Sequence, residues 1–271
     1  MPVTIRSLLE RKRRGERFAV LTAYDYTTAR ILAEAEIPVL LVGDSLGMVM
    51  LGYRNTLPVT MEEMLHHARA VARGAPDQLL VGDMPFNSYH ASDEQAIASA
   101  ASFLQAGMHA VKVEGGGRVA ALVAKLTERG IPVMGHLGLT PQSVLTFGGF
   151  KVQAKTREAA EWLIKDATLL QDEGVYALVI EGVPSVVGTR ITEALEIPTI
   201  GIGAGPDTDG QVLVLHDILG LTNHEPAKFV RQYAQLGTAI TEAVGHFAAD
   251  VRSGAFPDES EAYANPGDLL N

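Results

Sequence analysis

The sequence predicts an α/β protein, a (β/α)8 TIM barrel with a helix ahead of its first strand. Its 271 residues are enough for one large barrel or for two smaller domains. Short runs rich in Val, Ile and Leu alternate with longer amphipathic stretches. The runs are almost continuously apolar, which is typical of strands buried on both faces of a parallel sheet. Seven or eight such β–α units in about 220 residues favour a barrel.

The predicted strands come at regular intervals along the chain. Seven are expected, over residues 18–25, 39–44, 79–83, 110–114, 132–136, 177–181 and 198–203. An eighth run, 212–217, follows the seventh too closely for a crossover helix, so it is either a strand or part of a loop. A doubly wound open sheet is the alternative topology. It would normally have a Gly-rich nucleotide-binding turn after strand one, where this chain has Tyr24-Asp25-Tyr26.

Helices are expected between the runs. Residues 4–14 predict a helix before strand one, placed to close the bottom of the barrel. Two helix starts, Thr60–Glu63 and Ser92–Gln95, have the spacing of capping boxes. Three helical stretches end shortly before a strand at a glycine suited to a left-handed cap, namely Gly107, Gly130 and Gly174.

We expect residues 1–252 to form a single catalytic barrel domain, with residues 226–249 as its terminal helical region. Residues 253–271 contain four acidic residues, two prolines and no basic residue. We expect this C-terminal tail to be mobile.

Composition excludes several classes of function. The formal net charge is −10 and no cluster of Lys and Arg follows residue 14, so neither nucleic acid nor an anionic membrane is expected as a partner. The chain has no cysteine, which excludes disulfides, thiolate metal sites and cysteine nucleophiles. Its longest uncharged stretch, 131–150, is too rich in Gly, Pro and polar residues to span a membrane, and residues 1–10 lack the apolar core of a signal peptide. We therefore expect a cytoplasmic protein.

Charged and polar side chains stand at the ends of the predicted strands, and these ends meet at one rim of a parallel barrel. They are Asp44, Asp83, Lys112, Glu114, His136 and Glu181. The three carboxylates of Asp44, Asp83 and Glu114 predict an oxygen site for a hard cation such as Mg²⁺, which combines a few carboxylates with water and substrate oxygens. Any one of these acids alone is as well explained as a helix cap or an ion-pair partner. All six together favour an active site.

Other features carry weaker predictions. Gly201–Gly205 departs from the dinucleotide-binding pattern because Pro206 stands at the third required glycine, so it either lets the backbone approach a ligand or makes a tight turn. Two long connections, 45–76 and 137–155, lie beside the polar rim and are expected to shape or cover the site.

Several motifs in fixed order resemble those of one known family. They are Thr22–Tyr26, Leu41–Met48, Leu57–Thr60, Gly82–Phe86, Val111–Gly115, Gly135–Gln142, and Gly201–Gly205 with Asp209–Gln211. Together they closely resemble the ketopantoate hydroxymethyltransferase (3-methyl-2-oxobutanoate hydroxymethyltransferase) family of pantothenate biosynthesis. The resemblance runs from Thr4 to Phe256, and only the tail and residues 223–226 look less typical of the family.

The resemblance implies an Mg²⁺-dependent barrel enzyme that transfers a hydroxymethyl group from 5,10-methylenetetrahydrofolate to 3-methyl-2-oxobutanoate, giving 2-dehydropantoate. It further implies metal ligands at Asp44, Asp83 and Glu114 and a catalytic base at Glu181. The implied contacts with the oxo acid are Asp44, Ser45, Asp83, Lys112 and His136. The family typically forms homodecamers.

Physical reasoning supports these roles. A 2-oxo acid chelates a divalent cation, which stabilises the enolate formed beside the carbonyl. Glu181 lies three strands from Asp83 and could remove the single hydrogen at C3 of the substrate. Lys112 shares a strand face with Glu114 and offsets the charge of the acids. Two alternatives remain: a carbon–carbon lyase of the phosphoenolpyruvate mutase or isocitrate lyase type, many of which use a cysteine loop, and a barrel that only binds a metabolite.

Overall fold

A computed structural model describes residues 2–222 and 225–263 and contains the predicted closed parallel barrel. Its strands pair in chain order, and the last pairs with the first. The strands are β1 (Phe18–Thr22), β2 (Val39–Val42), β3 (Leu79–Asp83), β4 (Ala110–Glu114), β5 (Val133–Gly138), β6 (Ala177–Glu181), β7 (Thr199–Ile202) and β8 (Gly210–Leu213). The alternative of an open, doubly wound sheet is thus excluded.

The eighth strand is displaced from the predicted run 212–217. It begins at Gly210 and ends at Leu213, and Leu215 already starts a short helix, α10 (Leu215–Ile218). No crossover helix is needed between β7 and β8 because Gly210 pairs with Ile200, only two residues back from the end of β7. Because of this register, a short connection without a helix is enough to bring the chain from the end of β7 to the start of β8.

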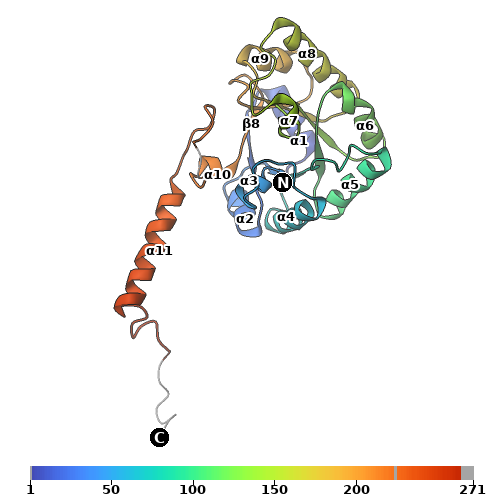
Figure 1. The fold of residues 1–271 in the computed structure, drawn as a ribbon. Coiled ribbons are helices and arrows are strands. Elements are labelled where there is room, and N and C mark those ends of the chain that lie inside the picture. Colours follow the sequence, from blue (N-terminus) through green and yellow to red (C-terminus); the bar gives the residue numbers. More distant parts are fainter. Residues whose placement is uncertain (1, 223–224, 264–271) are drawn as a thin grey trace. The chain divides into compact units, whose positions relative to one another are not determined.

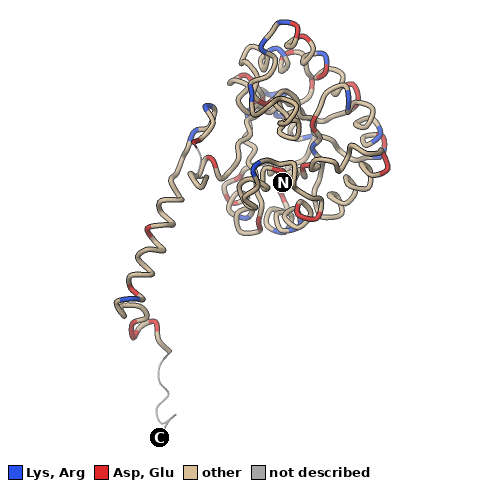
Figure 2. The backbone as a smooth tube through the Cα atoms, viewed as in Figure 1, with Lys and Arg blue, Asp and Glu red and all other residues tan. Residues whose placement is uncertain are grey.

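Helices surround the barrel (Figure 1), with acidic and basic residues interspersed along them (Figure 2). They are α2 (Tyr26–Glu34), α3 (Leu46–Val49), α4 (Met61–Gly74), α5 (Asp93–Gln105), α6 (Gly117–Thr127), α7 (Val144–Phe147), α8 (Arg157–Asp172) and α9 (Ser185–Ala194), with a 3-10 turn, η1, at Pro141–Ser143. The three predicted cap glycines have φ of 98°, 75° and 97°, which confirms their left-handed backbone.

One of the two predicted capping boxes is complete. Thr60 and Glu63 exchange both bonds at the start of α4. At α5, Ser92 accepts from the backbone of Gln95, but the Gln95 side chain donates to the Asn87 carbonyl instead. The prediction of a second capping box was therefore wrong, because the Gln95 side chain does not bond back to the backbone of Ser92. A nearby loop carbonyl competes for its amide group.

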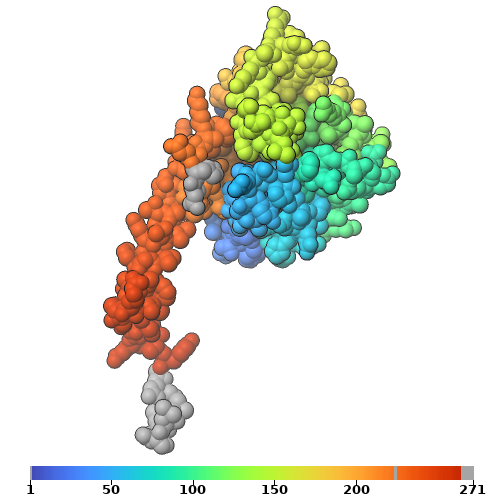
Figure 3. All heavy atoms as spheres, viewed as in Figure 1, coloured from blue at the N-terminus to red at the C-terminus, as the bar shows by residue number. Residues whose placement is uncertain are grey.

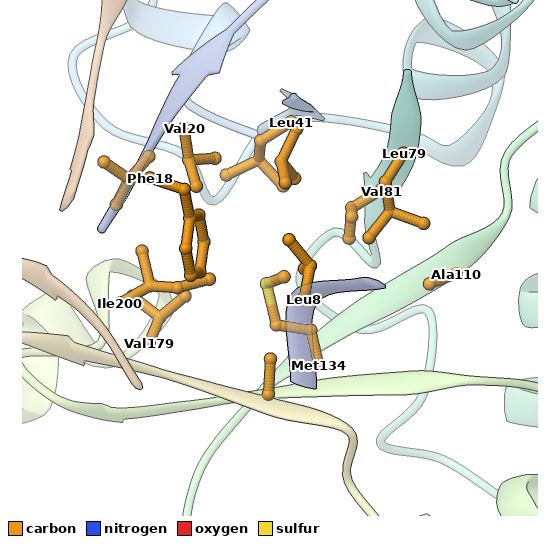
Figure 4. Packing of buried hydrophobic residues seen from close by; sticks show 13 residues of the cluster. Leu8, Phe18, Val20, Leu41, Leu79, Val81, Ala110, Met134, Val179 and Ile200 are labelled. Carbon is orange, nitrogen blue, oxygen red and sulfur yellow. The ribbon is translucent and has the colours of Figure 1, made fainter. Parts of the chain in front are cut away.

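The N-terminal helix α1 (Ile5–Arg14) has Thr4 as its N-cap, in agreement with the helix predicted over residues 4–14, and closes the barrel. Its Leu8 is fully buried among inward-facing side chains of the strands, including Phe18, Leu41 and Met134 (Figure 4). Lys12 adds an ion pair to Asp209, 2.8 Å away, just before β8. The expected plug of the barrel bottom is thus present, and it leaves the opposite rim for the site.

The two long connections lie on one face of the barrel. Figure 3 shows the segment around α3 in blue beside the yellow-green segment around α7. A hydrogen bond from Gln142 Nε2 in the second connection, 3.0 Å long, reaches Oδ2 of Asp44, the residue directly before the first connection. They partly cover the rim at which the strands end, as the sequence predicted.

The chain divides into two compact units, residues 1–215 and 216–271. The second unit contains most of α10 and the helix α11 (Leu236–Ser253). The predicted helical region 226–249 is therefore wrong in its start by ten residues. Backbone N–H groups of Tyr233 and Leu236 donate to the carbonyls of Ile218 and Leu219, which holds the preceding stretch as a loop.

The domain boundary at residue 252 and the mobility of the tail stay predictions. Residues 264–271 of the tail lie outside the described residues. Among the helices of the described residues, none has the length and apolar character needed to cross a bilayer.

The plug predicts a large stability effect at Leu8. Truncating this side chain in Leu8→Ala leaves a cavity at the barrel bottom and should lower the free energy of unfolding by about 2–5 kcal/mol in urea titrations. The matched control is Leu145→Ala, because Leu145 is 76% exposed. Equal, small losses in both variants would contradict the role of α1 as a plug.

Candidate active site

The carboxyl ends of β2 to β6 bring the predicted site residues together. Asp83 and Glu181 are the last residues of β3 and β6, and Asp44 follows β2 by two residues. Pairing within the sheet sets Asp83 beside Lys112 and Glu114 beside His136. These side chains reach the rim because their strands end there.

Three carboxylates form the centre of the site. Asp44, Asp83 and Glu114 each have an oxygen within 4.8 Å of the others. Their residues are only 3%, 2% and 6% exposed. The acids that the sequence predicted as a cation site thus form one compact, buried triad.

Lys112 is the cation of this cluster. Its Nζ lies 2.8 Å from Asp83 Oδ1 and 3.5 Å from Glu114 Oε1. Burial lowers the pKa of Lys112, but the charges of Asp83, Glu114 and Asp44 outweigh burial and hold that pKa above its ordinary value. The side chain therefore stays an ammonium, whose proton is not available for removal by the other groups of the site at neutral pH.

The single ammonium does not neutralise the triad. When all three acids are ionised, the single ammonium offsets only one of their three negative charges. Burial, together with repulsion from Asp83 and Glu114, raises the pKa of Asp44 well above its ordinary value. Burial also raises the pKa of Asp83, against the opposing charge of Lys112. The pKa of Glu114 is lowered, because Lys112 and His136 together outweigh its burial.

His136 stands between the triad and Glu181. Its Nδ1 lies 3.2 Å from Glu114 Oε1 and also 3.2 Å from Lys112 Nζ, and its Nε2 lies 3.1 Å from Glu181 Oε2. Burial and Lys112 lower the pKa of His136, but its contacts with Glu114 and Glu181 outweigh them and the pKa is raised. The Glu181 side chain is 14% exposed, more open than the triad.

Ser45, the remaining predicted residue, follows Asp44 directly. It precedes α3 without capping it, and its Oγ is 2.9 Å from the Tyr24 hydroxyl. The Tyr24 carbonyl is in turn 2.6 Å from His67 Nδ1. The hydroxyl of Ser45 is thus held by a tyrosine from the end of β1.

Two residues of the site were not predicted. Gln142 is 5% exposed and bonds to both Asp44 and Glu114. The Tyr89 hydroxyl donates to Gln142 Oε1 over 2.8 Å. Gln142 lies in the 3-10 turn η1 after β5 and Tyr89 in a loop after β3. A neutral side chain in such a connection has no periodicity or charge by which to recognise it.

The triad fits a hard divalent cation. Asp83 Oδ1 and Glu114 Oε1 are buried, and both face Lys112, while Glu114 Oε1 also faces His136 Nδ1. Burying three carboxylates beside a single ammonium is costly when all three are ionised. A cation of charge +2 would balance the remaining charge of the ionised acids, and carboxylate oxygens are the ligands that Mg²⁺ prefers.

Comparison with known proteins decides the family. The family model described as ketopantoate hydroxymethyltransferase matches residues 2–259. The chain belongs to the ketopantoate hydroxymethyltransferase family. It is 54% identical over 265 residues to the 3-methyl-2-oxobutanoate hydroxymethyltransferase of Koribacter versatilis, covering 97% of this chain and 90% of the relative. It is 52% identical to the enzyme of the same name from Carboxydothermus hydrogenoformans, covering 99% and 98%. The predicted family is confirmed.

Solved structures show a shared fold. A 2,3-dimethylmalate lyase, a member of the PEP mutase/isocitrate lyase superfamily, aligns with a TM-score of 0.60 at 15% identity over 97% of this chain and 92% of its own. Phosphonopyruvate hydrolase in complex with oxalate and Mg²⁺ aligns with a TM-score of 0.62 at 13% identity over 95% and 92%. At such low identity these likenesses concern the barrel alone.

The raised pKa values of Asp44 and Asp83 predict that Mg²⁺ stabilises the protein in a pH-dependent way. The folded protein binds protons at these acids more tightly than the unfolded chain does, so their ionisation lowers stability at neutral pH. That loss disappears as the pH falls through the raised pKa values, because protons then neutralise the acids. A cation should replace those protons at neutral pH.

Mg²⁺ at 100 times its Kd should therefore add about 2.7 kcal/mol at pH 7.5. This corresponds to a rise in Tm of several degrees, at about 2–4 °C per kcal/mol. The gain should shrink as the pH is lowered, and Asp83→Asn should abolish it while Glu158→Gln, on the exposed face of α8, should not. A gain in stability from Mg²⁺ that is independent of pH, or that survives in Asp83→Asn, would contradict the assignment of these acids as the cation site.

Proposed function

We propose that this protein transfers a hydroxymethyl group from 5,10-methylenetetrahydrofolate to 3-methyl-2-oxobutanoate, giving 2-dehydropantoate in pantothenate biosynthesis. Family membership supports the reaction. The observation that carries it is the position of Glu181, which His136 separates from a buried triad of acids. That arrangement suits proton removal from a carbon beside a chelated carbonyl.

Asp44, Asp83 and Glu114 are the proposed ligands of Mg²⁺. When bound, the cation supplies Lewis-acid polarisation of the keto oxygen and stabilises negative charge that develops there. The three acids leave room for substrate oxygens, because a hard cation takes about six ligands and these residues need supply only a few of them.

The oxo acid is proposed to contact Asp44, Ser45, Asp83, Lys112 and His136. Lys112 provides a permanent positive charge for a substrate carboxylate or keto oxygen. Ser45, held by Tyr24, offers a hydroxyl at the edge of the triad. These side chains come from several strands, so they fix the orientation of the substrate from several directions.

Glu181 is the proposed catalytic base. It takes the proton from C3 of the oxo acid, and the C–H electron pair becomes the double bond of the enolate. The contact between His136 Nε2 and Glu181 Oε2 supports an orientation of this carboxylate toward the triad. The enolate carbon then bonds to the methylene carbon of the folate. The methylene carbon has two carbon–nitrogen bonds: one breaks as the carbon–carbon bond forms, and water displaces the second nitrogen and supplies the hydroxyl group. Tetrahydrofolate leaves with two protons, one from C3 and one from the water.

Exchange of the C3 proton for deuterium tests the proposed base. In D2O with Mg²⁺, NMR should show exchange at C3 of 3-methyl-2-oxobutanoate, and Glu181→Gln should slow it by about 100- to 10,000-fold. Glu158→Gln, an exposed substitution of the same kind, should leave the rate unchanged.

The outcomes separate the alternatives. Exchange that persists at the wild-type rate in Glu181→Gln would contradict the assignment of Glu181 as the catalytic base. If the wild-type protein shows no exchange, a second run adds tetrahydrofolate to test for a step that requires the bound folate. Absence of exchange in both runs would favour a lyase of the phosphoenolpyruvate mutase or isocitrate lyase type, or a barrel that only binds its ligand.

The proposed assembly is a homodecamer. Helix α11 supports self-association because five of its apolar residues are exposed at helical spacing, namely Leu236, Ile240, Val244, Phe247 and Val251. None of its residues is buried. An apolar stripe of this kind is typical of a surface that another chain covers. A cytoplasmic location stays a prediction.

A charge in this stripe should weaken assembly. Val244→Asp should lower the mass measured by sedimentation velocity, because a carboxylate in an apolar interface loses its hydration without gaining a partner. Ala249→Asp adds the same charge on the opposite side of the helix at 3.6 residues per turn and should not. An unchanged mass in both variants would exclude this stripe from the interface.

A further inference from the structure

Gln142 holds an unusual position among the residues of the site. It is 5% exposed in the turn η1 that follows β5, and no strand carries it. Its backbone N–H donates to Glu114 Oε2 over 3.0 Å. Its side-chain Nε2 donates to Asp44 Oδ2 over 3.0 Å and to the Met84 carbonyl over 2.9 Å. One residue thus connects the acids of two separate strands.

The amide group is suited to these neighbours in a way that other side chains are not. Its nitrogen faces two acceptors, the Asp44 carboxylate and the Met84 carbonyl, while its oxygen accepts from the Tyr89 hydroxyl over 2.8 Å. The reverse orientation would place the amide oxygen against both acceptors. Tyr89 completes the network because its hydroxyl also accepts from the backbone N–H of Glu114 over 3.2 Å.

The network commits one oxygen of each acid. Gln142 occupies Oδ2 of Asp44 and Oε2 of Glu114, while Oε1 of Glu114 faces His136 Nδ1 and Lys112 Nζ at 3.2 and 3.5 Å. A carboxylate with one oxygen fixed has its other oxygen oriented as well. Neutral donors such as the Gln142 amide orient the carboxylates without changing the charge of the cluster, in which the acids outnumber the ammonium of Lys112.

We propose that Gln142 is a positioning residue that orients Asp44 and Glu114 for a divalent cation, with Tyr89 fixing its amide. This inference rests on the metal site of the proposed function. Hydrogen-bond partners that orient metal ligands typically change metal affinity by about 10- to 100-fold when they are removed.

The test measures binding of Mn²⁺ to the full-length protein without substrate, from the EPR signal of the free ion. Gln142→Met keeps the length of the side chain and removes its side-chain hydrogen bonds to Asp44 and Met84, while the backbone N–H bond to Glu114 stays. It should raise the Kd for Mn²⁺ by about 10- to 100-fold. Tyr89→Phe removes only the hydroxyl that fixes the amide, and it should raise the Kd by a smaller factor.

A matched control separates orientation from general loss of stability. Thr199 at the start of β7 is fully buried and its hydroxyl bonds to Asp209, away from the triad. Thr199→Val should lower Tm and leave the Kd for Mn²⁺ unchanged. The double variant Asp44→Asn with Gln142→Met should show less than the sum of the two single effects, because both changes act on one pair.

Each outcome has a distinct meaning. Failure of the wild-type protein to bind Mn²⁺ would contradict the proposed metal site, and this inference with it. Binding by the wild type that is unchanged in Gln142→Met would contradict only the role of Gln142. If Gln142→Met does not fold, Tyr89→Phe decides: a raised Kd supports the inference and an unchanged Kd overturns it.

Discussion

The active site depends on three carboxylates held close together in a buried position. Asp44, Asp83 and Glu114 share one ammonium, Lys112, which offsets only one of their three charges when all are ionised, where water is largely excluded. Such an arrangement is costly for the chain alone. It persists because the strands that carry the acids are fixed by the closed barrel. A divalent cation is the simplest ligand that removes the cost.

The barrel divides structural and chemical duties between its two ends. At one end α1 fills the interior with Leu8 and is held by the ion pair of Lys12 with Asp209. At the other end β3, β4 and β6 finish in the acids Asp83, Glu114 and Glu181, and two long connections lie over them. The packed core around Leu8 can therefore offset the unfavourable electrostatics of the buried acids at the other rim. Connections such as the one that contains Gln142 orient the acids by hydrogen bonds.

Much of this could be predicted from the sequence, because buried parallel strands appear as continuous apolar runs and a charge at the end of such a run is conspicuous. That reasoning located Asp83 and Glu181 at strand ends and brought the six polar residues to one rim. It left strand eight undecided, and the observed strand begins two residues before the candidate run 212–217, because Gly210 and Gln211 are not apolar and register decides their pairing. It missed Gln142 because the role of its side-chain amide depends on acceptors that are distant in sequence. It began α11 too early because backbone hydrogen bonds to Ile218 and Leu219 compete with helix formation.

The central claim is that the triad must be neutralised by a cation before an anionic substrate can bind. The most direct test is calorimetric titration of 3-methyl-2-oxobutanoate into the protein with Mg²⁺ and, separately, with a chelator. We expect measurable binding only with the cation, since a carboxylate that approaches the ionised acids at short range is repelled. Equal affinity under the two conditions would contradict the claim and assign the triad a purely structural role.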